Sequence, residues 1–304
     1  MKNDLEYQIA LTLVPNIKPV DAKRLIEEYG DARSIFYAAN SEMEKLEEAI
    51  GTIKARNIRS FRDFKRVEEE IVFVEKYNII PLFITDEEYP ARLRECYDPP
   101  TLLYYRGRAN LNATKVVAVV GTRYNTEQGR EITEQLVKDL SEYGILIVSG
   151  LAWGIDSVAH NAALRYNLRT VGVLGHGLDR IYPTEHADLA REILKSRGGL
   201  LTEFRKDTIP EKYNFPSRNR VVAGMSDAII VVETDVKGGS MITAQLANDY
   251  NKDVYAYPGR ITDPKSAGCN HLIRNQEAIM LTDTQQFIEA MNWEKPVSKP
   301  AYSY

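Results

Sequence analysis

Residues 115–123, KVVAVVGTR, decide the fold. Five consecutive apolar residues end at a glycine, which is typical of a strand buried on both faces of a sheet. Similar runs recur downstream, and each alternates with a stretch of helical periodicity. We predict strands at 115–121, 145–150, 170–175, 200–204, 228–233 and 253–259, and helices at 127–142, 155–166, 185–197, 218–224, 239–250 and 284–291. This alternation predicts an α/β fold: a Rossmann-like, mostly parallel sheet with helices on both faces.

The sequence before this sheet predicts a small all-helical domain over residues 1–77. Its segment LVPNIKPVDAKRLIEEYG resembles a helix-hairpin-helix or SAM-like module, although Asn16-Ile17-Lys18 replace the usual Gly-x-Gly hairpin. Such a module either packs against the rest of the protein or contacts DNA, and both roles stay open. One helix is predicted over 52–77, with four arginines on one face that are either solvated or DNA-binding: Arg56, Arg59, Arg62 and Arg66.

The remaining boundaries follow from changes in pattern. Residues 79–85 predict a strand, and residues 89–107 an irregular, proline-marked entry to the next domain. We therefore expect a sheet domain over 78–291 and a linker or tail over 292–304.

Composition excludes several classes of protein. The chain has 304 residues and a formal net charge of −4, with no apolar run near the roughly 20 residues of a membrane helix. Cys96 and Cys269 match no metal or redox spacing, and the four histidines do not cluster, so no metal site is predicted. Two lone thiols and an N-terminus without a signal pattern predict a cytoplasmic protein.

Four predicted strand ends run into glycine-containing loops that lead to helices. Since the carboxyl ends of parallel strands share one sheet edge, these loops should lie together where ligands usually bind. Their amides and the following helix N-termini favour an anion. The loops are Gly121-Thr122-Arg123, Ser149–Asp156, Gly175-His176-Gly177 and Lys237-Gly238-Gly239-Ser240.

The stretch Asn214–Arg220, NFPSRNR, supplies the most distinctive cations. Residues 205–220 hold five basic side chains against two acidic ones, a local surplus in an otherwise acidic chain. Arg218 and Arg220 suit bidentate contacts to phosphate, and Phe215 suits stacking on a base. The alternative is an arginine-rich loop paired with carboxylates inside the protein.

The known anion-binding enzymes fit this sequence poorly. Neither the dinucleotide fingerprint Gly-x-Gly-x-x-Gly nor the ATPase loop Gly-x-x-x-x-Gly-Lys-Ser/Thr occurs. The cytokinin-activating phosphoribohydrolases carry Gly-Gly-x-Gly-Thr-x-x-Glu, but Gln245 stands here in place of the glutamate. An amide does not titrate near neutral pH and cannot act as a general acid or base. The pattern therefore favours a binder without catalytic residues, and a nucleotide-processing enzyme of the phosphoribohydrolase type remains the alternative.

Seven motifs in order give a more specific indication. AVVGTR, IVSGLAWGIDSVAH, VGVLGHGLDRIYP, LLTEF, NFPSRNRVVAGMSDAIIVVE, GGSMITAQLA and YPG span about residues 80–285. Together they resemble the DNA-processing protein A (DprA/Smf) family. The resemblance implies a protein that binds single-stranded DNA, protects incoming strands in natural transformation and loads the RecA recombinase. It further implies a homodimer that associates through the sheet domain and does its strand-exchange work without ATP hydrolysis. Separately, we predict no cofactor and no membrane partner. Many relatives carry a C-terminal winged helix. The sequence stops at Tyr304, so this module is either absent or removed, and both alternatives stay open.

We assign DNA or phosphate binding to fifteen residues of these loops, with turn formation or helix capping as the alternative for most of them. For Arg123 the alternative is a salt bridge to Asp156 or Glu203. Asp156 itself is predicted to cap a helix, and His160 to lie in the core. The fifteen are Gly121, Thr122, Arg123, Ser149, Gly150, Gly154, Phe215, Arg218, Asn219, Arg220, Lys237, Gly238, Gly239, Ser240 and Thr243.

Overall fold

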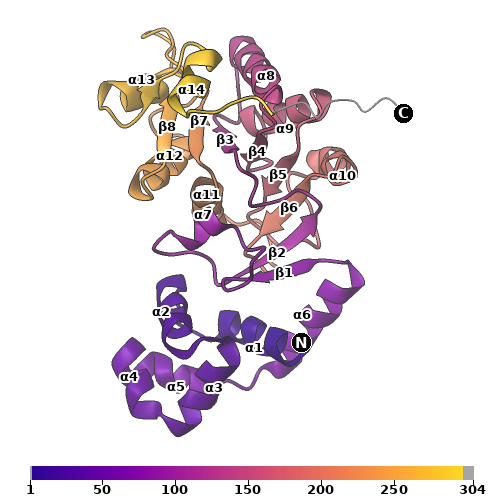
Figure 1. Ribbon diagram of the computed structural model, residues 1–304, viewed down its shortest axis with the longest axis vertical. Coiled ribbons are helices and arrows are strands. Elements are labelled where there is room, and N and C mark those ends of the chain that lie inside the picture. The colour runs from indigo at the N-terminus through magenta and orange to yellow at the C-terminus, as the bar shows by residue number, and fades with distance from the viewer. Residues whose placement is uncertain (1, 297–304) are drawn as a thin grey trace.

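The protein consists of a helical domain joined to a nine-stranded sheet that carries helices on both faces (Figure 1). This computed structural model describes residues 2–296. The helical domain lies at one end of the long axis, and the sheet domain occupies the rest of the molecule. Within the described range, no helix is long and apolar enough to cross a bilayer.

Six helices make up the N-terminal domain: α1 Lys2–Leu13, α2 Pro19–Tyr29, α3 Ala32–Ser41, α4 Met43–Ile50, α5 Thr52–Ser60 and α6 Phe64–Lys76. The single helix predicted over 52–77 is therefore wrong, because the chain breaks between α5 and α6. The side chain of Asp63 accepts a hydrogen bond from the backbone N–H of Arg66 and so caps a new helix. The cap starts a new helix at Phe64, even though the apolar residues keep one helical spacing from 52 to 77.

The sheet has the strand order β1-β2-β6-β5-β4-β3-β7-β8-β9. All pairings among β3 to β9 are parallel, whereas β1 pairs with β2 and β2 with β6 in antiparallel fashion. The mostly parallel sheet is thus confirmed. Its strands are β1 Ile80–Phe83, β2 Leu102–Gly107, β3 Val116–Val120, β4 Leu146–Ser149, β5 Thr170–Val173, β6 Gly199–Thr202, β7 Ala228–Val231, β8 Asp253–Ala256 and β9 Ile279–Met280.

Two hydrophobic cores cover the two faces of the sheet. Along β3, Val116 and Ala118 belong to one core, and Val117 and Val119 to the other, because successive side chains of a strand point to opposite faces. Helices α11 and α12 contribute to the first core, and α8 and α9 to the second. The helices of the sheet domain are α7 Ala91–Arg94, α8 Glu127–Ser141, α9 Ile155–Arg165, α10 Ala187–Lys195 with a preceding 3₁₀ turn Thr184–His186, α11 Asn214–Gly224, α12 Gly239–Asp249, α13 Ala267–Arg274 and α14 Thr284–Ala290.

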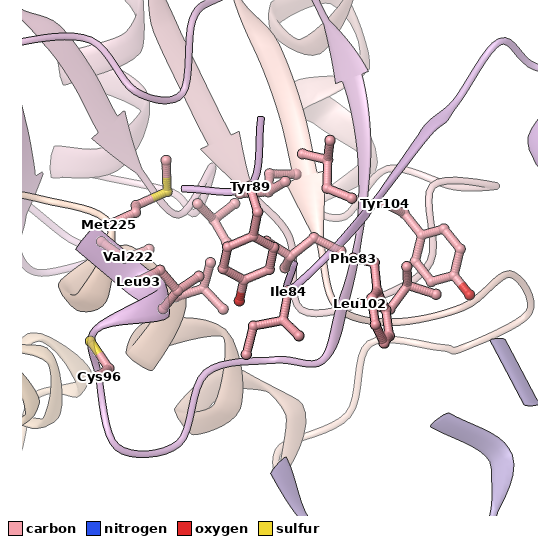
Figure 2. Close-up of a cluster of buried hydrophobic side chains, with 14 of the residues drawn as sticks. Phe83, Ile84, Tyr89, Leu93, Cys96, Leu102, Tyr104, Val222 and Met225 are labelled. Carbon is pink, nitrogen blue, oxygen red and sulfur yellow. The ribbon is translucent and has the colours of Figure 1, made fainter. Parts of the chain in front are cut away.

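The segment predicted as an irregular entry is instead a structured part of the sheet domain. It contains α7 and β2, and its side chains pack with Val222 and Met225 (Figure 2). Tyr89 is fully buried there, and its hydroxyl donates to the carbonyl of Pro100 at 2.7 Å. The prolines of this segment mark turns around a buried strand and do not exclude regular structure.

The helical and sheet domains share one continuous hydrophobic core. Polar contacts join them as well: Arg66 Nη2 donates to the carbonyl of Lys206 at 2.9 Å, and the N–H of Lys206 donates to Glu70 Oε1 at 3.0 Å. Burial raises the pKa of the Glu70 carboxyl. We propose a domain boundary near residue 77, and the two domains are in extensive contact across it.

The tail begins on the surface of the sheet domain. Trp293 packs edge-on against Phe287 of α14, with ring centroids 5.6 Å apart. Residues 297–304 of the predicted tail lie outside the described residues.

An arginine fastens α11 to the rest of the sheet domain. The Arg220 guanidinium forms an ion pair with the Glu203 carboxylate and donates to the carbonyl of Asp98. Both side chains of the pair are mostly buried, with exposed fractions of 10% and 15%. Burial raises the pKa of the Glu203 carboxyl, and Arg220 opposes that shift. Truncating one member leaves the other as an uncompensated buried charge.

We predict that Arg220→Ala lowers the free energy of unfolding by about 3 kcal/mol, as measured by urea denaturation at neutral pH. The difference in unfolding free energy between the variant and the wild type should narrow in acid. In the folded variant the Glu203 carboxyl has a raised pKa, so it is protonated as the pH falls, and the cost of burying its unpaired charge disappears. Arg165→Ala, which removes an exposed ion pair with Glu134, is the matched control and should cost about 1 kcal/mol or less. Equal losses in the two variants would contradict this account of Arg220.

Candidate nucleic-acid interface

A cavity of about 300 Å³ opens at the carboxyl ends of the parallel strands. The loops after β3, β4 and β7 line it together with α11 and the first turns of α12. In the sheet, β4, β5 and β6 follow one another on one side of β3, whereas β7 and β8 lie on its other side. The cavity therefore lies at the topological switch point, where open α/β sheets bind their ligands.

The loop after β3 forms one wall of this cavity, which we call the sheet-edge cavity. Gly121, Thr122 and Arg123 all line it, as predicted. The N–H of Thr122 donates to the carbonyl of Glu233 at 2.6 Å, and its own carbonyl accepts from the N–H of Ile155 at 3.2 Å. These bonds tie the loop to the end of β7 and to the start of α9, so the direction of Arg123 is set by the backbone before it.

Arg123 supplies the exposed cation of the site. Its guanidinium carbon lies 5.2 Å from the centre of the Phe215 ring, within the range of a cation–π contact. Neither Asp156 nor Glu203 forms an ion pair with it, so the alternative predicted for this residue is wrong. The exposed Arg123 guanidinium is available to a phosphate. The half-buried Phe215 ring also lies 6.0 Å from the Arg218 guanidinium carbon, so only its remaining surface is open to a base.

Arg218 is the second cation of the cavity, and it is 6% exposed. Its Nη1 donates to the carbonyls of Gly150 and Val173, the latter at 3.0 Å, and its Nε donates to Asn219 Oδ1 at 3.0 Å. Burial lowers the pKa of Arg218, and Asp156 opposes that shift. Much of this guanidinium is thus committed to strand-end carbonyls, so Arg218 shapes the cavity and contributes positive charge to it.

Asp156 anchors the loop after β4 from inside helix α9. Its carboxylate accepts the N–H of Gly150 at 3.1 Å and that of Ala152 at 3.4 Å, and makes no capping bond to its own helix. The predicted helix cap is therefore wrong, because the loop folds back over the carboxylate. Burial raises the pKa of this carboxyl, whereas Arg218 and the loop bonds lower it.

Two glycines are required where this loop passes its neighbours. Gly150 lies against Arg218, and a Cβ there would overlap the guanidinium. Gly154 has a φ of +78°, and a Cβ on it would overlap the carbonyl of Thr122. Gly150 lines the cavity, whereas Gly154 supports the wall from behind.

The N-terminus of α12 forms the opposite wall through four predicted residues: Gly238, Gly239, Ser240 and Thr243. No side chain caps this helix. Its first amides and its dipole are thus directed at the cavity, an arrangement that favours an anion. Asn219 Nδ2 donates to the carbonyl of Gly239 at 3.3 Å and links this wall to α11.

Three other predicted residues do not line the cavity. Ser149 is fully buried, and its hydroxyl donates to the carbonyl of Val119 at 2.7 Å. Arg220 pairs with Glu203 as described above, and Lys237 is exposed outside the cavity. Arg220 thus fits the alternative given for Asn214–Arg220, in which an arginine pairs with a carboxylate inside the protein. The stretch itself is not a loop: it forms the first two turns of α11, where Pro216 is tolerated because first-turn amides lack helical partners.

An aromatic group beside Phe215 was missed in part by sequence reasoning. Tyr182 lies 6.3 Å from Phe215 and 6.1 Å from Trp153 between ring centres, and all three line a small pocket next to the cavity. Tyr182 lies shortly after the glycine turn at 175–177, and its nearness to a strand end in the sequence is the feature that could have indicated it as a site residue. His176 of that turn is buried, and its Nε2 accepts the N–H of Tyr182 at 3.2 Å.

The core position predicted for His160 is confirmed. His160 is fully buried, its Nδ1 lies 2.7 Å from Thr170 Oγ1, and burial lowers its pKa to about 3. Over residues 2–296, no three His, Cys, Asp or Glu side chains come together as a metal site.

Several known proteins are similar to this chain in sequence and fold. Protein Smf of Synechocystis sp. is 36% identical over 293 residues, which cover 92% of this chain and 71% of that protein. DNA processing protein DprA of Streptococcus pneumoniae is 38% identical over 256 residues, covering 84% and 89%. The X-ray structure of the S. pneumoniae protein matches with a TM-score of 0.78 and 31% identity over 95% of this chain and 98% of that one. A structure of DprA from Helicobacter pylori, described for its single-stranded-DNA binding mode, matches with a TM-score of 0.65 and 33% identity over 72% and 98%.

The family model described as DNA recombination-mediator protein A matches residues 81–292, a span that includes every wall of the sheet-edge cavity. The order of seven motifs read from the sequence predicts the same family. The chain therefore belongs to the DprA/Smf family of DNA-processing proteins.

Proposed function

We propose that the chain binds single-stranded DNA in the sheet-edge cavity. The observation that carries this proposal is the exposed Arg123 guanidinium lying on the Phe215 ring, opposite the uncapped N-terminus of α12. A phosphate between Arg123 and the α12 amides would meet positive charge from both sides. The base attached to it would lie on Phe215 or on the neighbouring Tyr182, since every base has a π-face.

A strand fits this arrangement better than a mononucleotide. The aromatic pocket of Trp153 and Tyr182 continues from the cavity past Phe215, so successive bases have successive rings to stack on. A mononucleotide that competed fully with a long oligonucleotide for one site would instead favour a nucleotide sensor.

We propose that the site binds without breaking a bond. Gln245, which stands in the place of the phosphoribohydrolase glutamate, is exposed and donates to Asp249 at 3.0 Å, outside the cavity. Two carboxylates line the cavity. Asp156 is committed to loop amides, whereas Asp235 is exposed and accepts the N–H of Lys237 at 3.1 Å. Incubation with nucleoside monophosphates tests the point, and base release that depends on Asp156 or Asp235 would establish the rival enzyme.

We further propose that the protein acts in the cytoplasm as a recombination mediator, which protects incoming DNA in natural transformation and loads RecA as a homodimer. Family membership supports the mediator role. The edge strand β9 supports self-association, because Ile279 and Met280 are more than half exposed beside unpaired backbone groups. Sedimentation of the purified chain and RecA loading onto DNA coated with single-strand-binding protein test these proposals. A monomer at all concentrations, or no stimulation of loading, would reject them.

We predict that Arg123→Ala weakens binding to dT oligonucleotides of every length and reduces the log–log salt slope by about 0.7, the share of one phosphate. Phe215→Leu should cost about 1–3 kcal/mol through lost stacking and leave the salt slope unchanged. Fluorescence anisotropy across a salt series measures both quantities. Arg165→Ala is the matched loss of an exposed arginine on α9, and comparable weakening there would show a non-specific charge effect.

We predict opposite outcomes for two Gly→Ala substitutions in the cavity wall. Gly150→Ala should displace the Arg218 guanidinium, lower stability by about 1–3 kcal/mol and weaken DNA binding. Gly239→Ala should keep full stability, because a Cβ at that position meets no atom within 4 Å. Thermal unfolding compares the two variants, and a Gly150→Ala protein as stable as Gly239→Ala would show that Arg218 is free to move.

A further inference from the structure

A second pocket, of about 150 Å³, lies on the helical domain. Helices α1, α3 and α5 line it together with the break that leads into α6, and no part of the sheet domain contributes. We call it the helical-domain pocket. The family match begins at residue 81, so the pocket falls outside it.

Aromatic side chains form the floor of the helical-domain pocket. Phe36 and Phe61 are buried, Tyr7 and Phe64 half-buried, and neighbouring rings among them lie 5.4–6.2 Å apart. Tyr37 completes the rim and is 56% exposed. The floor belongs to the core of the domain, but an exposed tyrosine above an open aromatic floor leaves a π-surface for a planar ligand.

Arginines surround the same opening. Arg59 and Arg62 line the pocket and are exposed, and the Arg33 guanidinium lies 5.4 Å from the centre of the Tyr37 ring. Arg62 donates to the carbonyls of Arg59 and Phe61, which places its charge at the C-terminal end of α5. Among the residues that the structure describes, no carboxylate lies within ion-pair distance of Arg59 or Arg62.

The nearby acidic groups do not cancel these cations. They are Asp63, which caps α6 by accepting the N–H of Arg66, and Asp4 of α1, and the arginines of the rim outnumber them. Arg56 adds a further exposed cation on α5, one turn before Arg59. The rim therefore carries a surplus of positive charge over an aromatic floor, the combination with which proteins bind single-stranded nucleic acid.

A surface hollow of mixed charge lies between the helical-domain pocket and the sheet-edge cavity. Arg66, one turn into α6, lines it together with Arg205, Lys206 and Asn214, and Asp207 and Glu211 line it as well. Asn214 begins α11, and the next residue, Phe215, lines the sheet-edge cavity. A strand that leaves the cavity over Phe215 would cross this hollow before it reaches Arg62 and Phe64, and there Arg66 is paired with Glu70 and Lys206 with Asp207.

We propose that the helical-domain pocket is a second contact for the same single strand of DNA, in which one base stacks on Tyr37 and its phosphates pair with Arg59 and Arg62. This inference rests on the proposed function of the sheet-edge cavity. It explains why a module without the Gly-x-Gly hairpin keeps an arginine-lined opening beside its aromatic core.

The test compares two lengths of dT oligomer, about 5 and about 20 nucleotides, on the full chain. We expect the variant Tyr37→Leu/Arg59→Ala/Arg62→Ala to bind the short oligomer as the wild type does and the long one about tenfold more weakly. The salt slope for the long oligomer should fall by about 1.4, the share of two phosphates. The control variant Tyr77→Leu/Arg165→Ala/Arg191→Ala removes the same side chains from other surfaces and should bind both oligomers normally.

The outcomes separate the two proposals. Unchanged binding of the long oligomer by the triple variant, with normal binding by the wild type, would overturn the second contact and leave the sheet-edge cavity intact. An equal loss for both lengths would also overturn it. Failure of the wild type to bind either oligomer would reject the proposed function itself. Photocrosslinking with 5-iododeoxyuridine along the long oligomer is an independent measurement, and an adduct on Tyr37 supports the proposal even if the variant folds poorly.

Discussion

The buried guanidinium of Arg218 is the interaction on which the functional edge of this protein depends. From α11 it reaches the carbonyls of Gly150 and Val173, at the ends of β4 and β5, and so holds the helix across two neighbouring strands. A buried charge costs several kcal/mol unless it is paired and hydrogen-bonded. Asp156 provides the opposing charge, and its carboxylate also holds the loop amides in place. Gly150 is required because a larger residue would occupy the space of the guanidinium.

This arrangement separates the residues that build the cavity from those that meet a ligand. Arg218, Asp156 and Arg220 are buried and satisfied by protein groups. The Arg123 guanidinium, the first amides of α12 and part of the Phe215 ring lie at the cavity wall, where a ligand could contact them. Positioned cations, amides and rings suit a phosphate and a base, and Asp235 is an exposed carboxylate beside them.

The helical domain is part of the same physical unit. Its core is continuous with that of the sheet domain, and Arg66 and Glu70 bond directly to the loop before α11. Movement of one domain would therefore disturb the base of α11, which carries Phe215 and Arg218 of the site. A strand bound to both pockets would strengthen that connection.

The sequence by itself determined the architecture and the edge at which the site lies. Apolar runs that end in glycine, such as 115–121, report burial on both faces, and burial is a local property that composition and spacing record. The same pattern brought Gly121, Arg123, Gly150 and the α12 glycines to one edge of the sheet. Only the tertiary structure decided what each side chain does there. Arg218 and Arg220 stand two residues apart on a helix, so they point about 200° apart, one into the cavity wall and one toward Glu203. Whether an arginine meets a ligand or a buried carboxylate depends on helix phase and on neighbours distant in the chain, and the short-range pattern contains neither.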